Sequence, residues 1–159
     1  MALVHQRVNM ATKFTFKYKG DIKDLEKVND DIDDIVKEVL LKGANVAADS
    51  LRSTTRSLKT GARPGNGKRY LNSTEKSALL ANMGYTPQGS KGSVIDRKAG
   101  FEGYTKTGFP VPKLANFINV GAGYQIKQPF LDTATSKARR KANDEMDKKM
   151  QKEINKRLR

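Results

Sequence analysis

The basic, glycine-rich stretch 59–69 is the first part of the sequence whose residue types and spacing suggest chemistry. Gly61, Gly67 and Lys68 invite comparison with a P-loop, in which backbone amides and a lysine cradle phosphates. The comparison fails because the motif needs four residues between these glycines and the chain has one more, while Arg69 replaces the magnesium-binding Ser or Thr. The strand-then-helix setting is also missing. We interpret 59–69 as an exposed loop.

Three other patterns were weighed as chemical sites. The four aspartates between Asp30 and Asp34 could suggest a metal, but they alternate with isoleucines on one expected helix and mostly face outward, so a solvated acidic face is the better interpretation. The turn 121–123 lacks the third glycine of a dinucleotide fingerprint, because Ile126 takes its place. His5, the single histidine, lies in a terminal arm and supports no triad. We expect no enzyme, metal or cofactor.

Composition limits the chain to one domain with a thin core. It has 159 residues, of which 36% are hydrophobic and 30% charged, which is enough for about two layers of structure. The absence of cysteine excludes disulfides and thiolate metal sites. No apolar run approaches the roughly 20 residues that cross a bilayer, and the N-terminal apolar stretch is too short for a signal peptide. We expect a soluble protein with no membrane partner.

The charge is strongly and unevenly basic. Thirty-one Lys and Arg against 17 Asp and Glu give a net charge of +14. Such an excess favours a polyanionic neighbour, most often nucleic acid, although a solvated basic surface explains it equally well. The segment 21–50 is acidic inside this basic chain, which suggests that subunits also attract one another.

The N-terminal half predicts an arm over 1–11, a strand and a long helix. Residues 12–19 alternate aromatic with polar or basic side chains, as in a half-buried strand, and Gly20 stops it. Asp21 is suited to cap a helix from about Ile22 to Ser57, whose apolar residues recur every three or four positions. Gly43 is the weak point at which this helix could kink or split.

The middle of the chain predicts smaller elements. A basic loop region, 59–92, contains a short helix over 71–83. Segments 93–98 and 101–106 are predicted to be a hairpin that turns at Ala99 and Gly100. The apolar segment 111–120 ends at Gly121-Ala122-Gly123, whose glycines suit the positive φ of a sharp turn.

A long helix is predicted to follow Pro129 to the C-terminus. Its apolar positions are spaced by four residues, so with 3.6 residues per turn the row drifts about 40° per step. We infer that the first half packs on its own domain and the second half meets a partner, the alternative being a frayed tail. The row comprises Ala134, Ala138, Ala142, Met146, Met150, Ile154 and Leu158.

The order of these parts resembles the head–tail joining, or tail-completion, proteins of long-tailed bacteriophages. The specific part is 114–134, with Leu114-Ala115-Asn116-Phe117-Ile118-Asn119-Val120-Gly121 followed by Gln128-Pro129-Phe130-Leu131-Asp132. Members typically have tyrosine–alanine, apolar residues and glutamate before the glycine turn, and proline–phenylalanine opening the last helix. The chain departs from this pattern at Asn119, near where an acidic residue is expected, and over 62–92.

The resemblance implies a ring, usually of six subunits, between the capsid connector and the tail tube. We therefore expect an α+β fold in which a small antiparallel sheet is packed by a long N-terminal and a long C-terminal helix. The expected function is a structural neck protein of the virion, assembled in the host cytoplasm, that surrounds the channel for genomic DNA. Its expected partners are its own copies, the connector or head-completion protein, and the tail tube or tail terminator. The alternative is a basic, sequence-independent nucleic-acid-binding protein, architectural or ribosome-associated.

Three groups of residues are assigned candidate roles. Facing DNA we place Arg63, Lys68 and Arg69. At the subunit interface we place Asp30, Asp31, Asp34, Met146, Lys149, Met150 and Ile154. The structural motif comprises Asn119, Gly121, Gly123, Pro129 and Phe130, where Phe130 is expected to anchor the last helix in the chain's own sheet.

Overall fold

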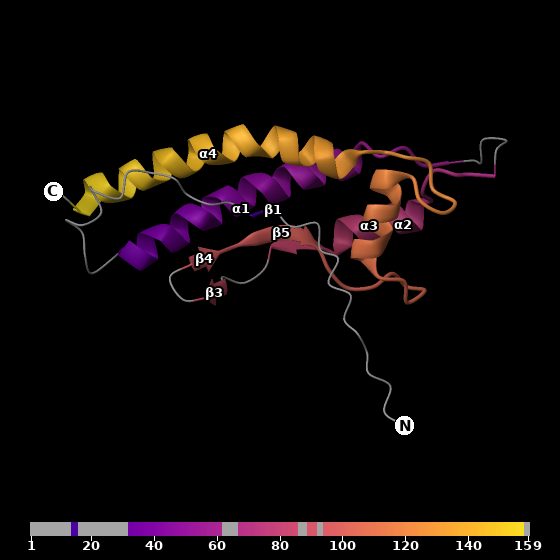
Figure 1. Cartoon of the computed structure of the whole chain (residues 1–159), viewed down its shortest axis with the longest axis horizontal. Helices are drawn as coiled ribbons and strands as arrows, with labels where there is room; N and C mark the ends of the chain where they lie inside the picture. Colours follow the sequence, from indigo (N-terminus) through magenta and orange to yellow (C-terminus); the bar gives the residue numbers. More distant parts are fainter. Residues whose placement is uncertain (1–13, 16–31, 62–66, 86–88, 92–93, 158–159) are drawn as a thin grey trace, which may run out of the picture.

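The computed structural model describes residues 14–15, 32–61, 67–85, 89–91 and 94–157, and shows an α+β fold (Figure 1). The predicted arm, most of the first strand, the start of the first helix and part of the basic loop lie outside these residues. The elements, in chain order, are β1 (Phe14–Thr15), α1 (Ile32–Arg56), α2 (Ser73–Ala81), β2 (Met83–Tyr85), β3 (Gly89–Lys91), β4 (Val94–Asp96), β5 (Lys98–Phe101), α3 (Val111–Val120) and α4 (Phe130–Arg157).

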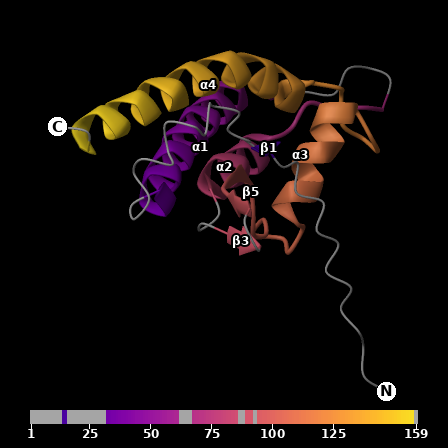
Figure 2. The same ribbon diagram turned by 60° about the vertical axis from the view of Figure 1, so that its left-hand side comes forward.

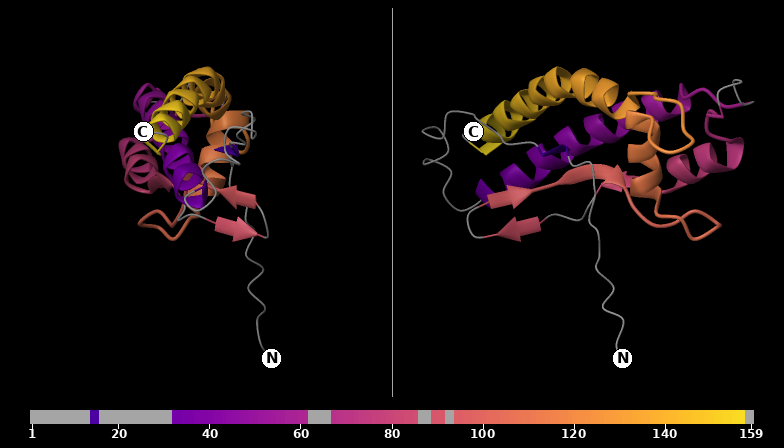
Figure 3. Two further views of the ribbon diagram at one scale, coloured as in Figure 1. Left: turned by 90° about the vertical axis from the view of Figure 1, so that its left-hand side faces the viewer. Right: turned by 45° about the vertical axis from the view of Figure 1, so that its right-hand side comes forward.

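The two long helices and the sheet form layers, with α1 in the middle. Helix α4 lies antiparallel along one side of α1, and β5 and β2 pack against another side of it (Figures 1 and 3). Helices α2 and α3 close the end of the molecule at which α1 finishes and α4 begins, as the rotated view also shows (Figure 2). The expected pair of long helices on a small antiparallel sheet is confirmed, with α4 packing mostly on α1.

The sheet differs from the predicted hairpin. Strand β5 is central, pairing antiparallel with β1 and with β2, and the two-stranded ladder is formed by β3 and β4. Ala99 and Gly100, predicted to be a turn, lie inside β5. That prediction was wrong, and for Ala99 the small side chain has another reason. Ala99 is buried in a cluster with Ala47 and Ala48 of α1 and Ala138 of α4, where only small side chains let three elements meet.

Helix α1 is continuous, so the expected weak point at Gly43 is no break. A Cβ built on Gly43 would lie 2.5 Å from Met146 Sδ, which means that the glycine makes room for the methionine of α4. At its C-terminal end, the carbonyls of Arg56 and Leu58 accept hydrogen bonds from Lys76 Nζ at 2.6 and 2.7 Å. A cation at this end also suits the helix dipole, so α2 holds the end of α1.

The drifting apolar row of α4 stays on α1 along its length, contrary to our inference. Met146 and Met150 are fully buried against Ile35 and Val39, and Ile154 packs at the edge of the same cluster. The second half of α4 therefore packs on its own domain. The buried row on α4 comprises Phe130, Leu131, Ala134, Ala138, Ala142, Met146 and Met150.

Charged side chains fill the positions that the apolar row leaves as it drifts. Glu145 lies only about 20° from the line of Ala134, because eleven residues make almost three whole turns, and Lys149 and Glu153 follow it in steps of four that drift as the apolar row does. They bind α1 and each other: Lys42 Nζ lies 3.4 Å from Glu145, and Lys149 Nζ lies 2.6 Å from Glu38 and 2.8 Å from Glu153. The inference failed because it treated α4 as straight, whereas α4 curves along α1 and the drifting apolar row stays in contact with it.

The main core lies where α1 ends, between α2, α3, the sheet and the start of α4. Phe130, predicted to anchor α4 in the sheet, is buried there, and its ring centroid is 6.0 Å from that of Phe101 in β5. This prediction is confirmed. The cluster comprises Leu51, Leu58, Leu71, Leu79, Met83, Phe101, Val111, Leu114, Ala115, Ile118, Phe130, Leu131 and Ala134.

The contact between Gly43 and Met146 predicts a reversal of sign in a double-mutant cycle. Gly43→Ala should destabilise the protein, because overpacking a buried site typically costs about 1–3 kcal/mol while the gain in helix propensity is only about 1 kcal/mol. In a Met146→Ala background the same substitution should stabilise it by up to about 1 kcal/mol, because the obstructing atoms are gone. Denaturant unfolding of the four proteins measures both effects. Additive effects would contradict the assigned contact.

Candidate functional site

The joint between α3 and α4 contains most of the predicted structural motif. Asn119, on the last turn of α3, is buried, and its Oδ1 accepts a hydrogen bond from the Leu131 backbone N–H at 3.0 Å. Its Nδ2 donates to Asp132 Oδ2 at 3.3 Å. One amide therefore caps the first turn of α4 and positions the Asp132 carboxylate. Without this cap, the backbone N–H in the first turn of the helix would have only water as its hydrogen-bond partner.

The turn between the two helices reverses the chain tightly. Gly121 ends α3 with φ 77° and Gly123 has φ 59°, which confirms the predicted positive-φ glycines. A Cβ on Gly121 would lie 2.7 Å from Lys127 Cβ, so the turn folds directly onto the segment before Pro129. Gln128 then accepts from Lys59 N–H at 2.8 Å and donates to Lys59 carbonyl at 3.2 Å. This side chain ties the exit of α1 to the entrance of α4.

Arg69, predicted to face DNA, is engaged within the scaffold of the fold. Its guanidinium donates to both Glu75 carboxylate oxygens, at 2.7 and 2.5 Å, and to Tyr70 carbonyl at 3.1 Å. It also stacks on the Tyr124 ring, 4.7 Å from the centroid. Backbone bonds between Arg69 and the 124–126 segment reinforce the contact. The residue joins the start of α2 to the α3–α4 joint.

Glu75 serves two partners at once. Its carboxylate accepts from Arg69 and also from the Asn72 backbone N–H, while Asn72 Oδ1 accepts from Glu75 N–H at 2.7 Å, which completes a capping box at the start of α2. Burial alone would raise the pKa of Glu75, but the hydrogen bonds from Arg69 and Asn72 and the guanidinium charge outweigh it and lower this pKa. The carboxylate is thus held ionised.

The other two DNA-facing candidates have different outcomes. Lys68 is exposed, and its Nζ donates to Gly121 carbonyl at 3.2 Å, so it braces the turn of the joint. Arg63 lies outside the described residues. Of the three basic residues assigned to one surface, the structure therefore links Lys68 and Arg69 to the scaffold through the same turn.

The subunit-interface candidates are mostly engaged within the chain. Asp30 and Asp31 lie outside the described residues, and Asp34 is exposed and bonded to Lys37 at 2.6 Å. The hydrogen bonds that Lys149 donates to Glu153 and then to Glu38 raise the pKa of Lys149. Because Met146, Met150 and Lys149 are used in the contact with α1, the reason for placing them at an interface is removed.

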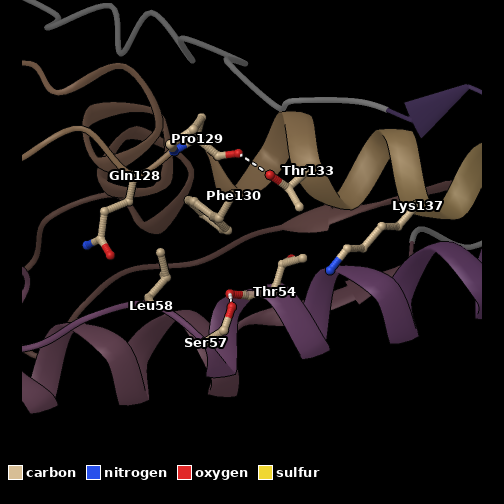
Figure 4. A pocket seen from close by; sticks show the side chains of 8 residues that line it. All are labelled: Thr54, Ser57, Leu58, Gln128, Pro129, Phe130, Thr133 and Lys137. Carbon is tan, nitrogen blue, oxygen red and sulfur yellow. Dashed lines mark hydrogen bonds between the residues drawn. The ribbon is translucent and has the colours of Figure 1, made fainter.

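Two small pockets lie beside the joint. The first, of about 170 Å³, is lined by side chains from the end of α1 and the start of α4 (Figure 4). Its hydroxyls are occupied, since Ser57 donates to Thr54 carbonyl and Thr133 to Pro129 carbonyl, both at 2.8 Å, while Lys137 extends from α4 toward α1. The lining residues are Thr54, Ser57, Leu58, Gln128, Pro129, Phe130, Thr133 and Lys137.

The second pocket, of about 250 Å³, lies between the start of α2, the 105–109 segment and Tyr124. The carboxylate in its wall is Glu75, which Arg69 already pairs. Within the described residues no cluster of His, Asp or Glu side chains could hold a metal ion, and no helix is long and apolar enough to span a membrane.

Comparison with known proteins found no matching family model, no similar curated protein and no similar solved structure.

Removing the cap at Asn119 should destabilise the joint. Asn119→Ala leaves the buried Leu131 N–H without its acceptor and should lower the free energy of unfolding by about 1–2 kcal/mol. Thermal or denaturant unfolding measures the loss. Asn116→Ala, on the same helix at a half-buried position, is the matched control and should cost less. Equal losses in the two variants would contradict the cap.

The Arg69–Glu75 pair predicts a pH-dependent contribution to stability. Glu75→Gln keeps the shape of the capping box but removes the charge, and should cost about 1–2 kcal/mol at pH 7. Since the folded-state pKa of Glu75 is below its ordinary value of 4.5, the stabilisation is complete above that pH and is lost as pH falls further. The difference between wild type and variant should therefore shrink below about pH 4.5. Glu102→Gln, at an exposed position, should show no such trend.

Proposed function

We propose that this chain is a structural subunit of the neck of a long-tailed bacteriophage. In this role it forms a ring with its own copies, joins the capsid connector to the tail, and leaves a central channel for the genome. The proposal gives the protein a mechanical task in the virion and no catalytic one.

The observation that carries the proposal is the α3–α4 joint. The stretch 114–134, which carries the family resemblance, forms one physical unit: Gly121 reverses the chain and Phe130 seats α4 beside Phe101, while Asn119, where the chain departs from the family pattern, caps α4. Because the turn fixes the spacing of these residues, their joint role supports the proposal that residues 114–134 fold as the corresponding stretch of the family does. The family's neck function follows from that relationship by analogy.

The shape of the molecule is a second support. Beyond the main core, α1 and α4 continue as a two-helix arm whose apolar seam is a small separate cluster. Exposed apolar side chains lie nearer the joint: Tyr104 is 68% exposed, and Val120 and Tyr124 are about half exposed. Tyrosine is enriched at interfaces, so these positions suit contact with a neighbouring subunit or ring.

The alternative function is a basic protein that binds nucleic acid without forming a ring. The net charge of +14 and the number of exposed lysines favour it. The two proposals differ in the partner that the protein requires. A neck subunit must bind other protein subunits to form its ring, whereas an architectural protein needs only nucleic acid.

Oligomeric state and particle assembly test the proposal. The purified chain should form a closed oligomer, six copies being the expectation from the resemblance, as measured by sedimentation or native mass spectrometry. Deleting its gene from the phage that encodes it should give filled heads and separate tails, and supplying the chain in trans should restore joined particles. A chain that remains monomeric, with normal particles in its absence, would overturn the proposal.

The exposed apolar residues give a sharper variant. Tyr104→Ser combined with Val120→Ser should leave folding nearly intact, because exposed substitutions usually cost less than about 0.5 kcal/mol. Assembly into the oligomer should weaken. Glu102→Ser combined with Thr107→Ser, at exposed positions close by, should assemble normally. If both pairs assemble alike, the apolar side chains are not at the interface.

A further inference from the structure

The basic side chains fall into two groups according to whether the fold already uses them. Arg69 binds Glu75, Lys76 binds the end of α1, Lys68 braces the joint, and Lys149 crosses the seam between the long helices. On α1, the other cations with acidic partners are Lys37, Lys42 and Arg52. Part of the positive charge therefore stabilises the fold and gives no information about a binding partner.

The cations without such partners gather on α4. Lys137, Lys141, Lys152 and Lys156 are exposed and form no ion pair with any residue in the described part of the chain. Arg139 and Arg140, on the same helix, are exposed as well. Elsewhere in the described residues, the comparable exposed cations are scattered over separate segments, at Arg56, Lys59, Lys106, Lys113 and Lys127.

Five lysines of α4 form a row along the helix, here called the lysine row. Lys137, Lys141, Lys148, Lys152 and Lys156 are spaced by four or seven residues, so each is displaced by only about 20–40° around the helix from the one before. All five are exposed. Its length from Lys137 to Lys156 is about 28 Å at 1.5 Å per residue.

We propose that the lysine row of α4 is a sequence-independent binding surface for the phosphate backbone of double-stranded DNA. The inference rests on the proposed function in placing DNA beside the protein, and it names the surface that meets it. The row replaces the basic loop residues Lys68 and Arg69, which the fold itself uses.

Charge and length both fit this occupant. Duplex DNA carries one negative charge per about 1.7 Å of axis, so a 28 Å row of single cations always has phosphates within reach in any register. Helix α4 is the outer layer on its side of α1, and the row extends along the long axis of the molecule (Figure 1). Lysine is a flexible point charge that contacts phosphates without reading bases, which suits a surface along which a genome must slide.

Acidic residues nearby set a limit on the strength of binding. Asp144 and Asp147 are exposed on the same helix, and Glu145 contacts Lys148 at 3.3 Å as well as Lys42. The middle of the row is therefore less positive than its two ends. We therefore expect the lysine row to bind DNA weakly and to release it readily as the salt concentration rises.

The test compares two variants of equal charge in the full chain. The row variant is Lys137→Gln, Lys141→Gln, Lys152→Gln and Lys156→Gln, which spares Lys148 because of its partner. The scattered control is Arg56→Gln, Lys59→Gln, Lys106→Gln and Lys127→Gln. Binding of a short labelled duplex of arbitrary sequence is followed by fluorescence anisotropy over a series of salt concentrations, with circular dichroism to show that both variants are folded.

The wild-type chain should bind, with log affinity falling linearly against log salt. The row variant should lose at least about tenfold in affinity at low salt and reduce the slope by about 3 to 4, because each phosphate contact contributes about 0.9. The scattered control should keep the wild-type affinity and the wild-type slope to within the contribution of about one phosphate contact. Equal losses in the two variants, no loss in the row variant, or no binding by wild type would each overturn the proposal.

A second arm separates this inference from the neck function. The row variant should still form the same oligomer as wild type, since its substitutions are exposed on α4. If wild type forms the oligomer and joins particles but does not bind DNA, the lysine row proposal fails alone. If the row variant binds an acidic protein partner less well while DNA binding is unchanged, the surface belongs to that partner and the proposal also fails.

Discussion

The close approach of α1 and α4 is the constraint on which the rest of the structure depends. Helix α1 is covered by α4 on one side and by β5 on another, so it must present small residues toward both. Gly43 admits Met146, and Ala47 and Ala48 meet Ala138 and Ala99. A larger side chain at any of these positions would force an entire element outward, because packed interiors transmit volume changes instead of absorbing them.

That approach also determines how the charges are used. Because α4 stays close to α1 along its full length, some of its polar residues lie at the edge of the contact between the two helices. There they form ion pairs, which involve Lys42, Glu38, Glu145, Lys149 and Glu153. Arg69 and Lys76 similarly join elements at the other end of the molecule. Once these pairs are set aside, most of the remaining exposed cations of the described residues lie on α4, so the net charge of the sequence gives a poorer guide to partners than the residual charge on each face.

Sequence reasoning predicted the long elements well and the meaning of small residues poorly. The periodicity of α4, the anchoring of Phe130 and the glycine turn of 121–123 were all predicted, because each depends on local spacing or local backbone geometry. Gly43 and Ala99-Gly100 were misinterpreted as a helix weak point and a hairpin turn. Gly43 and Ala99 are small because another element lies against them, which local propensity does not reveal. The Arg69–Glu75 pair was missed for a related reason: its capping box, Asn72 to Glu75, was visible in the sequence, but the arginine partner was assigned to solvent.

The joint gives a physical reason for an amide at position 119. The position must offer an acceptor to Leu131 N–H and must also lie beside the Asp132 carboxylate. An amide satisfies both, because its oxygen accepts from the backbone while its nitrogen donates to the carboxylate. A carboxylate at 119 would supply the acceptor but would place two negative charges together in a largely buried site, where like charges are costly. Asn119 and Asp132 are therefore best understood as one unit, and a change at either position should be tolerated when the other changes with it.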